Sequence, residues 1–450
     1  MTYLLYVSAF FIVVSILILV HEFGHFLVAN WCGVRVERFS IGFGKPFYTW
    51  KSKNGVTKYT IAPFLLGGYV KLLDTRETKV SFLNRRLAFD YKPFPQRLAV
   101  IMAGSLANML FAFFAFWLMF VIGFKAPKPV VGEVLPNSIA SSAHMSAGEE
   151  IIEVDKRTIS NWPEVIVAML SRIGDSGGLA VTTNNKRYEL NLDRWQLDEY
   201  NPDPLLDFGL VRYKPLILPV VHEIIADSPA AESGLQTGDR IIKVGDKRVH
   251  NWDELIEQIK LYPKKRVELL IKRDRNKLEL PVDIGWKFGR GWKKVGFLGV
   301  GPDTEKIIWP EDKLREYKFG VFSAILAAKH QLLLFLDLNR VILGKLVTGK
   351  ISSSILGGPI ATFAASGKAL EQGFITFLSF LAVISLTIAI INLLPLPGLD
   401  GGYLIIILIE AIRRRPISLR TQSIILRLGI IIFIMLILHT TVNDLTRIFG

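Results

Sequence analysis

The sequence has a single cysteine, Cys32, among its 450 residues. One thiol cannot form an intramolecular disulfide, and it cannot supply the clustered thiolates of a cysteine-type metal site. The chain is therefore expected to have neither a disulfide framework nor a metal site of that kind.

Four long segments contain almost no charge, although 21% of all residues are charged. They are residues 4–20, 97–124 after Arg97, 374–394, and 422–442, where Arg427 interrupts the run. Each approaches the ~20 apolar residues needed to cross a bilayer. The sequence therefore predicts a polytopic α-helical membrane protein with about four transmembrane helices.

The first apolar segment also lacks the marks of a secretory signal peptide. No basic region precedes it, no small-residue cleavage site follows it, and the apolar run is too long for such a peptide. We expect it to be a transmembrane helix that continues through HEFGH, at 21–25, into FLVANWC.

Acidic residues are too few to balance the basic ones, and the formal net charge is +14. A nucleic-acid partner could explain such a charge. However, residues 33–96 alone carry 12 Lys or Arg against four acidic residues, and RRR stands at 413–415. The positive-inside rule accounts for both segments by placing them in the cytoplasm, so no nucleic-acid partner is expected.

The soluble stretch between the second and third apolar segments contains an internal repeat. VVGEVLPNSIASSAHMSAGEEIIEVDKRTISNWPE, from Val130, aligns without a gap with VVHEIIADSPAAESGLQTGDRIIKVGDKRVHNWDE, from Val220, and 12 of 35 positions are identical. Each copy predicts a β-rich start, a short helix of small residues, a glycine turn, a short apolar strand and a second helix.

The second copy, through SPAAESGLQTGDRIIKVGD, resembles the PDZ domains of bacterial membrane and periplasmic proteases. The first copy matches less well, because His144 replaces Gly234 and Glu149 replaces Asp239. We interpret both copies as α+β PDZ domains. Such domains bind an extended peptide as an added strand, although tandem copies could also be inert spacers.

Residues 321–347 are apolar but include Lys329, His330, Asp337 and Arg340. The last three share one face of a helix. This pattern favours an amphipathic helix in the membrane interface over a fifth span.

HEFGH is an HExxH motif. On a helix, His21 and His25 lie on one face within reach of one zinc ion, and Glu22 can act as the base toward a water molecule. The alternative is that these side chains only hydrogen-bond within a helix bundle. Because one charged side chain in the bilayer costs about 2.5–3.5 kcal/mol, a functional site is the better interpretation.

A catalytic zinc site normally has three protein ligands. The third candidate is Asp400 in INLLPLPGLDGGYL, between turn-forming Pro-Gly and Asp-Gly pairs at the end of the third apolar segment. If the first span ends in the cytoplasm, the second span leads out of the cytoplasm and the third leads back. Asp400, at the end of the third, then lies level with His21 and His25. A span at 321–347 would place it about 30 Å away. The same order of crossings places both PDZ domains, which follow the second span, outside the cytoplasm, in the periplasm of a Gram-negative cell.

With these motifs, the chain resembles the site-2 protease family of intramembrane zinc metalloproteases. The similarity covers nearly the whole chain and includes HEFGHFLVANWCGVRVERFSIGFGK, LLGGYVKLLD, GSLANML, LGGPI and NLLPLPGLDG. It implies Zn²⁺ bound by His21, His25 and Asp400, with Glu22 as catalytic acid/base.

The resemblance also implies residues that position the substrate, namely Asn392 and, in GxxxN, Asn108. It implies a membrane-reentrant hairpin that holds the substrate extended, formed by Gly68, Tyr69, Val70 and Lys71. An unwound substrate would supply the pairing that a strand edge needs inside the membrane. An ordinary cytoplasmic hairpin is the alternative for this segment.

The function so implied is hydrolysis of peptide bonds within transmembrane segments of single-pass proteins, such as an anti-sigma factor after a first cut and signal-peptide remnants. The expected location is the bacterial inner membrane, in contact with membrane lipid, with the active site near the cytoplasmic side and periplasmic PDZ domains that filter substrates. The predicted organisation is two spans with the cytoplasmic loop and hairpin at 1–128, PDZ domains at 129–215 and 216–303, a linker with the interfacial helix at 304–365, and two spans at 366–450.

Two positions depart from the family pattern: Ser105 follows Gly104 where many relatives have proline, and Tyr403 follows LDGG where many have histidine. At these two positions the family pattern predicts neither the backbone conformation nor the hydrogen bonds around the ligands.

An alternative function is a non-proteolytic, zinc-binding PDZ membrane scaffold. Glu22 argues against it, because a structural zinc site closes with four ligands and needs no base. A zinc transporter would need polar residues through several spans, and the second and fourth offer few.

Overall fold

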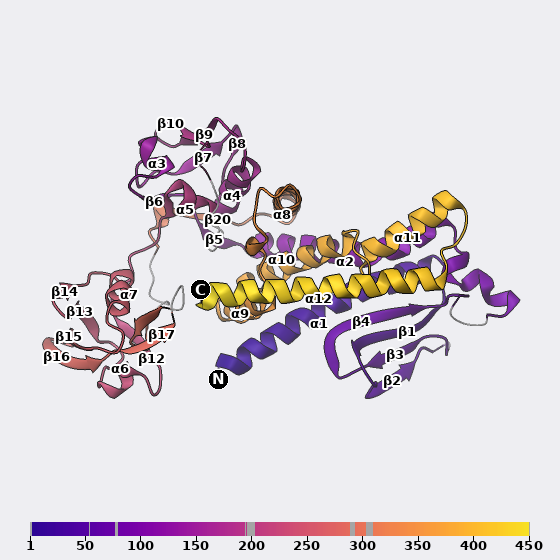
Figure 1. Ribbon diagram of the computed structural model, residues 1–450, viewed down its shortest axis with the longest axis horizontal. Coiled ribbons are helices and arrows are strands. Elements are labelled where there is room, and N and C mark those ends of the chain that lie inside the picture. The colour runs from indigo at the N-terminus through magenta and orange to yellow at the C-terminus, as the bar shows by residue number, and fades with distance from the viewer. Residues whose placement is uncertain are drawn as a thin grey trace. The chain divides into compact units, whose positions relative to one another are not determined.

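The computed structural model describes residues 2–53, 55–76, 80–193, 195, 203–288, 293–302 and 309–449. The chain forms two compact units (Figure 1). The first, which we call the helical unit, comprises Met1–Phe124, Glu316–Leu343 and Leu356–Val442. The second, which we call the repeat unit, comprises Lys125–Arg315, Gly344–Ile355 and Asn443–Gly450.

Four helices in the described part of the chain are long and apolar enough to cross a membrane. They are α1 (Thr2–Trp31), α2 (Phe94–Ile122), α10 (Phe374–Leu393) and α12 (Leu419–Phe449). These helices coincide with the four predicted segments. The charged helix α8 (Ser323–Val347) is not among the four, in agreement with the preference against a fifth span.

Helix α2 packs against both α1 and α10. Ala112 and Ala115 of α2 and Ala382 of α10 are at most 5% exposed and belong to one buried cluster. On the α1 side, a Cβ added to Gly24 would lie 2.4 Å from the carbonyl oxygen of Ala103. Small residues allow helices to approach closely where lipid provides no hydrophobic drive for association. The glycine within HEFGH therefore allows the motif to lie directly against α2.

The segment after α1 forms a four-stranded sheet in the order β2-β3-β1-β4 (Figure 1). Its strands are β1 (Val36–Phe43), β2 (Tyr48–Lys51), β3 (Lys58–Ile61) and β4 (Phe64–Leu72). β1 pairs parallel with β3 and antiparallel with β4. The predicted hairpin is therefore part of a larger sheet: β3 and β4 follow each other in sequence, but both pair with β1. β4 occupies one edge and contacts α1.

The two repeat copies have the same sheet topology. The order β10-β9-β7-β8 of the first copy corresponds to β16-β15-β13-β14 of the second. The first copy contains β6 (Val131–Val134), α3 (Ile139–Ser142), β7 (Ile151–Val154), β8 (Arg157–Thr158), α4 (Trp162–Ser171), β9 (Gly178–Thr183), β10 (Arg187–Asn191), α5 (Pro204–Phe208) and β11 (Leu210–Arg212). The second contains β12 (Val221–Ile224), α6 (Pro229–Glu232), β13 (Arg240–Val244), β14 (Lys247–Arg248), α7 (Trp252–Lys260), β15 (Arg266–Arg273), β16 (Asn276–Asp283), β17 (Gly285–Phe288), β18 (Lys294–Phe297) and β19 (Val300–Pro302).

The substitution of histidine for glycine does not change the turn in the first copy. His144 has φ 57° and Gly234 has φ 76°, so both adopt the left-handed conformation. A residue with a Cβ is strained there, by roughly 1–2 kcal/mol. The weaker sequence match of the first copy thus leaves the fold intact at this turn.

The remaining elements connect these parts. They are η1 (Phe82–Leu87), η2 (Phe89–Tyr91), β5 (Phe124–Pro127), η4 (Glu311–Lys313), β20 (Leu314–Tyr317), η5 (Ser353–Ile355), α9 (Pro359–Glu371) and α11 (Asp400–Arg413). The sequence did not predict α9 or α11. The Pro-Gly and Asp-Gly pairs indicated a loop around Asp400, whereas Asp400 is the first residue of a 14-residue helix.

Candidate metal centre

Helix α1 presents the two histidines of HEFGH side by side. Its 3.6-residue period places side chains four apart on one face. The Nε2 atoms of His21 and His25 lie 3.3 Å apart. Both side chains are largely buried, with 11% and 14% of their surface exposed.

Asp400 reaches this pair from the other end of the chain. Its Oδ2 atom lies 3.2 Å from Nε2 of His21 and 3.5 Å from Nε2 of His25. The turn that places it needs glycines, since a Cβ on Gly401 or Gly402 would lie 2.2 or 2.4 Å from a backbone carbonyl oxygen. The structure thus brings His21, His25 and Asp400 together, each offering one ligand atom within 4.8 Å of the others.

The hydrogen bonding of His25 fits metal binding. Its Nδ1 atom lies 2.7 Å from the carbonyl oxygen of Val100 on α2, which can only accept a hydrogen bond. The ring proton is therefore on Nδ1, and the lone pair of Nε2 faces His21 and Asp400. Metal-ligating histidines are commonly oriented in this way.

The space beside the ligand atoms also fits a metal ion. A Cβ on Gly104 of α2 would lie 2.4 Å from Nε2 of His25 and 2.7 Å from Nε2 of His21. Glycine at position 104 therefore keeps a side chain out of the position next to both nitrogens. Two imidazoles and one carboxylate form a typical three-residue donor set for catalytic zinc.

A cavity of about 580 Å³ opens on the three side chains. Glu22 of α1 and Tyr69, Val70 and Lys71 of β4 line it. A Cβ on Gly68 would lie 3.1 Å from Cγ of Glu22, so β4 passes directly beside the predicted base. The structure therefore gathers the predicted ligands, the predicted base and the predicted substrate-holding strand around one cavity.

The two predicted asparagines occupy different positions. Nδ2 of Asn392, near the end of α10, lies 3.5 Å from Nε2 of His21. Asn108 lies one helical turn beyond Gly104 on α2 and is fully buried. Neither side-chain amide atom of Asn108 has a hydrogen-bond partner among the described residues. An unpaired buried amide costs about 1–3 kcal/mol, which a ligand that hydrogen-bonds to it would recover.

The sequence did not identify the contributions of Gly104 and Ser105. Ser105 is fully buried and its Oγ donates a hydrogen bond to Oδ2 of Asp400 over 3.4 Å. Ser105, the first departure from the family pattern, thus provides a hydroxyl that helps to orient the carboxylate. Tyr403, the second departure, lines the same cavity. The four-residue spacing of Gly104 and Asn108 was the available signal that both lie on the same face of α2.

Comparisons with known proteins place these residues in a family. The model of peptidase family M50 matches residues 9–436. The chain is 41% identical over 447 residues to the regulator of sigma-E protease RseP of Salmonella typhimurium, covering 98% of both chains. It is 39% identical over 446 residues to the protein of the same name from Escherichia coli, again covering 98% of both.

A more distant relative is the regulator of sigma E protease of Haemophilus influenzae, which is 34% identical over 458 residues, with 100% of both chains covered. Among solved structures, the PDZ domain of the SdrC-like protein from Listeria monocytogenes is 17% identical and matches 21% of this chain and 94% of its own, with a TM-score of 0.17.

Proposed function

Because this chain belongs to peptidase family M50 and is an intramembrane metalloprotease, we propose that it binds Zn²⁺ through His21, His25 and Asp400 and uses Glu22 as its catalytic acid/base. The observation that carries the proposal is the convergence of three ligand atoms within 4.8 Å beside a cavity that Glu22 also lines.

The protein's own residues have distinct tasks in the hydrolysis. Zinc, when bound, would supply a Lewis acid that polarises the scissile carbonyl and lowers the pKa of a water ligand. Glu22 accepts a proton as water attacks the carbonyl carbon, and then donates it to the amide nitrogen that leaves. Ser105 and Val100 hold Asp400 and His25 in orientation.

Strand β4 supports an extended binding mode for the substrate. β1 pairs with one side of β4, and within the described part of the chain no strand pairs with the other side. A substrate segment that unwinds at the site would pair with this edge through Gly68–Lys71 and satisfy its own exposed peptide groups. Asn392 and Asn108 would then hydrogen-bond to the same segment, since the amide of Asn108 is buried without a partner among the described residues.

We further propose that the substrates are single-pass transmembrane proteins of the bacterial inner membrane, including an anti-sigma factor after a first cut and signal-peptide remnants. The names of the relatives, which are regulators of sigma-E, support this choice. The repeat copies, as PDZ domains at 129–215 and 216–303, would lie in the periplasm and exclude substrates with bulky ectodomains. The active site would lie near the cytoplasmic side, where residues 33–96 concentrate 12 Lys or Arg.

The test is cleavage of a tagged single-pass substrate by the wild type and Glu22→Gln, both reconstituted in bilayers. We expect the rate to fall by about 10²–10⁴-fold, the typical contribution of a general base, while zinc content is retained. Glu311→Gln is the matched control, because the Glu311 side chain is 93% exposed. Cleavage by Glu22→Gln at the wild-type rate would refute the assigned role and leave a non-proteolytic scaffold as the better interpretation.

A further inference from the structure

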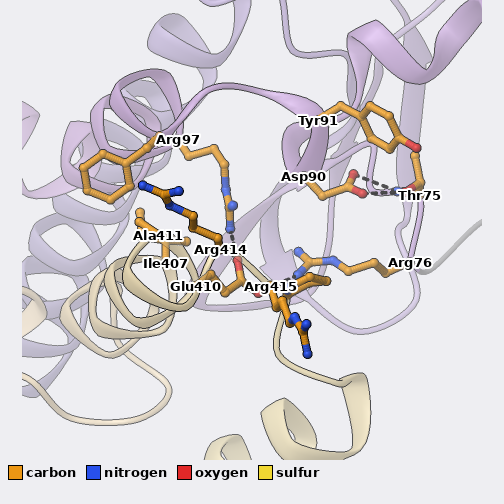
Figure 2. Close-up of a pocket in the computed structure, with 12 residues that line it drawn as sticks. Thr75, Arg76, Asp90, Tyr91, Arg97, Ile407, Glu410, Ala411, Arg414 and Arg415 are labelled. Carbon is orange, nitrogen blue, oxygen red and sulfur yellow. Dashed lines mark hydrogen bonds and ion pairs between the residues drawn. The ribbon is translucent and has the colours of Figure 1, made fainter.

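A second cavity, of about 460 Å³, shares Arg76, Arg97 and Ile407 with the catalytic cavity (Figure 2). We call it the arginine pocket. Its remaining lining residues are Thr75, Asp90, Tyr91, Phe94, Glu410, Ala411, Arg414, Arg415 and Pro416. We propose that the arginine pocket binds the phosphate headgroup of an anionic membrane phospholipid.

The two carboxylates of the pocket are already engaged within the protein. Asp90 accepts hydrogen bonds from the backbone N–H of Thr75, over 2.9 Å, and from the Thr75 hydroxyl. Glu410 accepts from Nη2 of Arg97 over 2.5 Å, from Nη1 of Arg76 over 3.4 Å and from the backbone N–H of Ile417 over 3.0 Å. Figure 2 shows Arg97 and Arg76 approaching Glu410 from different sides.

Arg414 and Arg415 remain without a carboxylate partner in the part of the chain that the structure describes, although both line the pocket. Nη2 of Arg76 also lies 2.6 Å from Oδ2 of Asp74, so the four guanidinium groups meet three carboxylates and leave an excess of one positive charge. Guanidinium groups bind phosphate oxygens through paired, charge-assisted hydrogen bonds. The ligand expected here therefore carries a single negative charge on a phosphate.

The backbone at Arg414 has a strained conformation. Arg414 ends α11 in the left-handed conformation, with φ 52°. This is the helix-terminal position at which glycine is normally preferred, and a side chain there costs roughly 1–2 kcal/mol. Strain of this kind at a residue with a Cβ is often found at ligand-binding sites.

A membrane lipid fits the surroundings better than a soluble anion. Phe94, which lines the pocket, is the first residue of the candidate span α2. Ile405, Leu408, Ile409 and Ile412 of α11 are 38–75% exposed, so this helix presents an apolar surface up to its last turn, on the face opposite to its pocket-lining residues. A phospholipid at this end of the helices can place its acyl chains along the apolar spans while its phosphate reaches Arg414 and Arg415, which follow the last turn of α11. Basic pockets at the ends of transmembrane helices bind acidic headgroups in this way.

The experiment measures lipid binding to the full-length protein in detergent by native mass spectrometry. We expect phosphatidylglycerol to bind at least tenfold more tightly than phosphatidylcholine. The charge-removing double variant Arg414→Gln/Arg415→Gln should reduce this preference to less than twofold. The matched control is Arg413→Gln/Arg420→Gln, which removes the same charge from two exposed arginines that do not line the pocket.

Each alternative has its own outcome. Equal losses in the two double variants would show diffuse surface attraction and overturn the assignment of the pocket. Competition by inorganic phosphate or glycerol 3-phosphate at concentrations comparable to the lipid would show a soluble-anion site. Competition by an acidic peptide would show a peptide site, and either result would overturn the lipid proposal.

A second variant tests the role of the Arg414 side chain in a protein that is expected to remain folded. Arg414→Gly removes the side chain but suits the left-handed backbone, so it should melt at a higher temperature than the wild type in lipid-free detergent. The same variant should show a smaller increase in melting temperature when phosphatidylglycerol is added. An undiminished increase would overturn the role of Arg414.

Discussion

At Gly104, a single added methyl group would crowd the candidate metal centre. In Gly104→Ala, the new Cβ would lie 2.4 Å from Nε2 of His25 and 2.7 Å from Nε2 of His21. We therefore expect zinc occupancy at limiting metal to fall roughly tenfold or more, as when ligand orientation is disturbed in other zinc sites, with a parallel loss of proteolysis. Metal analysis of the purified protein measures the loss.

Gly344→Ala is the control for Gly104→Ala. Gly344 lies within α8, and no atom lies within 4 Å of the position of an added Cβ. Alanine there should stabilise the helix by up to about 1 kcal/mol and leave zinc content unchanged. Equal zinc content in the two variants would contradict the steric explanation.

Single residues were predictable where a motif specifies chemistry and not where function depends on space or on a distant partner. His21, Glu22 and His25 follow from HExxH, and Asp400 followed from the need for a third ligand. The hydrogen bond from Ser105 to Asp400 joins residues 295 positions apart, and no spacing in the sequence reveals it. The void beside Gly104 depends equally on tertiary packing.

At the scale of elements, α11 shows how turn residues can mislead. Pro-Gly and Asp-Gly pairs predicted a loop, and Gly398 does adopt φ 94°. However, Gly401 and Gly402 serve close packing against the turn at Leu394 and Leu396, and the helix begins at Asp400. Local propensity gave the turn correctly and missed the helix, because close packing favours glycine as strongly as a turn does.

The two repeat copies have a buried carboxylate at the same position, but different side chains donate hydrogen bonds to it. In the second copy, Arg273 donates to both oxygens of Asp239, over 2.8 and 2.7 Å. Ninety residues earlier the corresponding pair is Thr183 and Glu149, which are 2.9 Å apart, and Tyr188 donates to the other oxygen of Glu149 over 2.6 Å. The sequence difference at Glu149 is thus compensated by two neutral donors.

Arg273→Ala should strongly destabilise the second copy, because it leaves the 1%-exposed carboxylate of Asp239 without its cation. Burial alone would raise the pKa of Asp239, but the hydrogen bonds from Arg273 hold it below the ordinary value. Breaking such a pair from one side leaves the carboxylate without a counter-charge, so the loss of stability should clearly exceed that for an exposed pair. Hydrogen exchange of β13 and β15 peptides would measure the loss.

Arg266→Ala provides the comparison for Arg273→Ala. Arg266 and its partner Asp283 are 69% and 75% exposed and 4.0 Å apart. An exposed pair contributes about 0–1 kcal/mol, so exchange should change little. Similar protection in both variants would show that the Asp239 pair does not stabilise this copy.

The first copy should respond to alkaline pH through Tyr188. Burial raises the pKa of Tyr188, and the hydrogen bond to the Glu149 carboxylate raises it further, to about 12. The folded-state pKa is above the unfolded value of about 10, so the stabilisation is complete below that pH and is lost as pH rises through about 12.

Absorbance titration at 295 nm, as the difference between wild type and Tyr188→Phe, should therefore give a midpoint near 12. Glu149→Gln should lower this midpoint because it removes the neighbouring negative charge. A midpoint near 10 in the wild type would contradict the buried hydrogen bond.

For the whole molecule, the proposed topology places residues 33–96 and the repeat copies on opposite sides of the membrane. The lone Cys32 makes this testable, since Cys32→Ala removes every native thiol. On that background, Lys53→Cys and Lys277→Cys should react with a membrane-impermeant maleimide from opposite sides of oriented vesicles. Labelling of both from the same side would refute the order of crossings on which the topology depends.

The four candidate spans and the repeat were predictable because each has a long signature in the sequence: nearly charge-free runs of bilayer length and a 90-residue offset. The arrangement of the strands was not, because β1 pairs with β3 and β4 rather than with its sequence neighbour β2. Such pairing depends on contacts distant in sequence, which alternation of residue types does not encode.

The separation of the metal ligands along the chain also affects how the enzyme is made. His25 and Asp400 are 375 residues apart, so a ribosome that adds about 5–20 residues per second needs about 20 to 75 s to go from one to the other. During that interval the nascent chain has only two of its three proposed metal ligands, His21 and His25. With the ligands as proposed, a partly synthesised copy would be unable to cleave the helices inserted around it, and proteolytic capacity would appear only when synthesis is nearly complete.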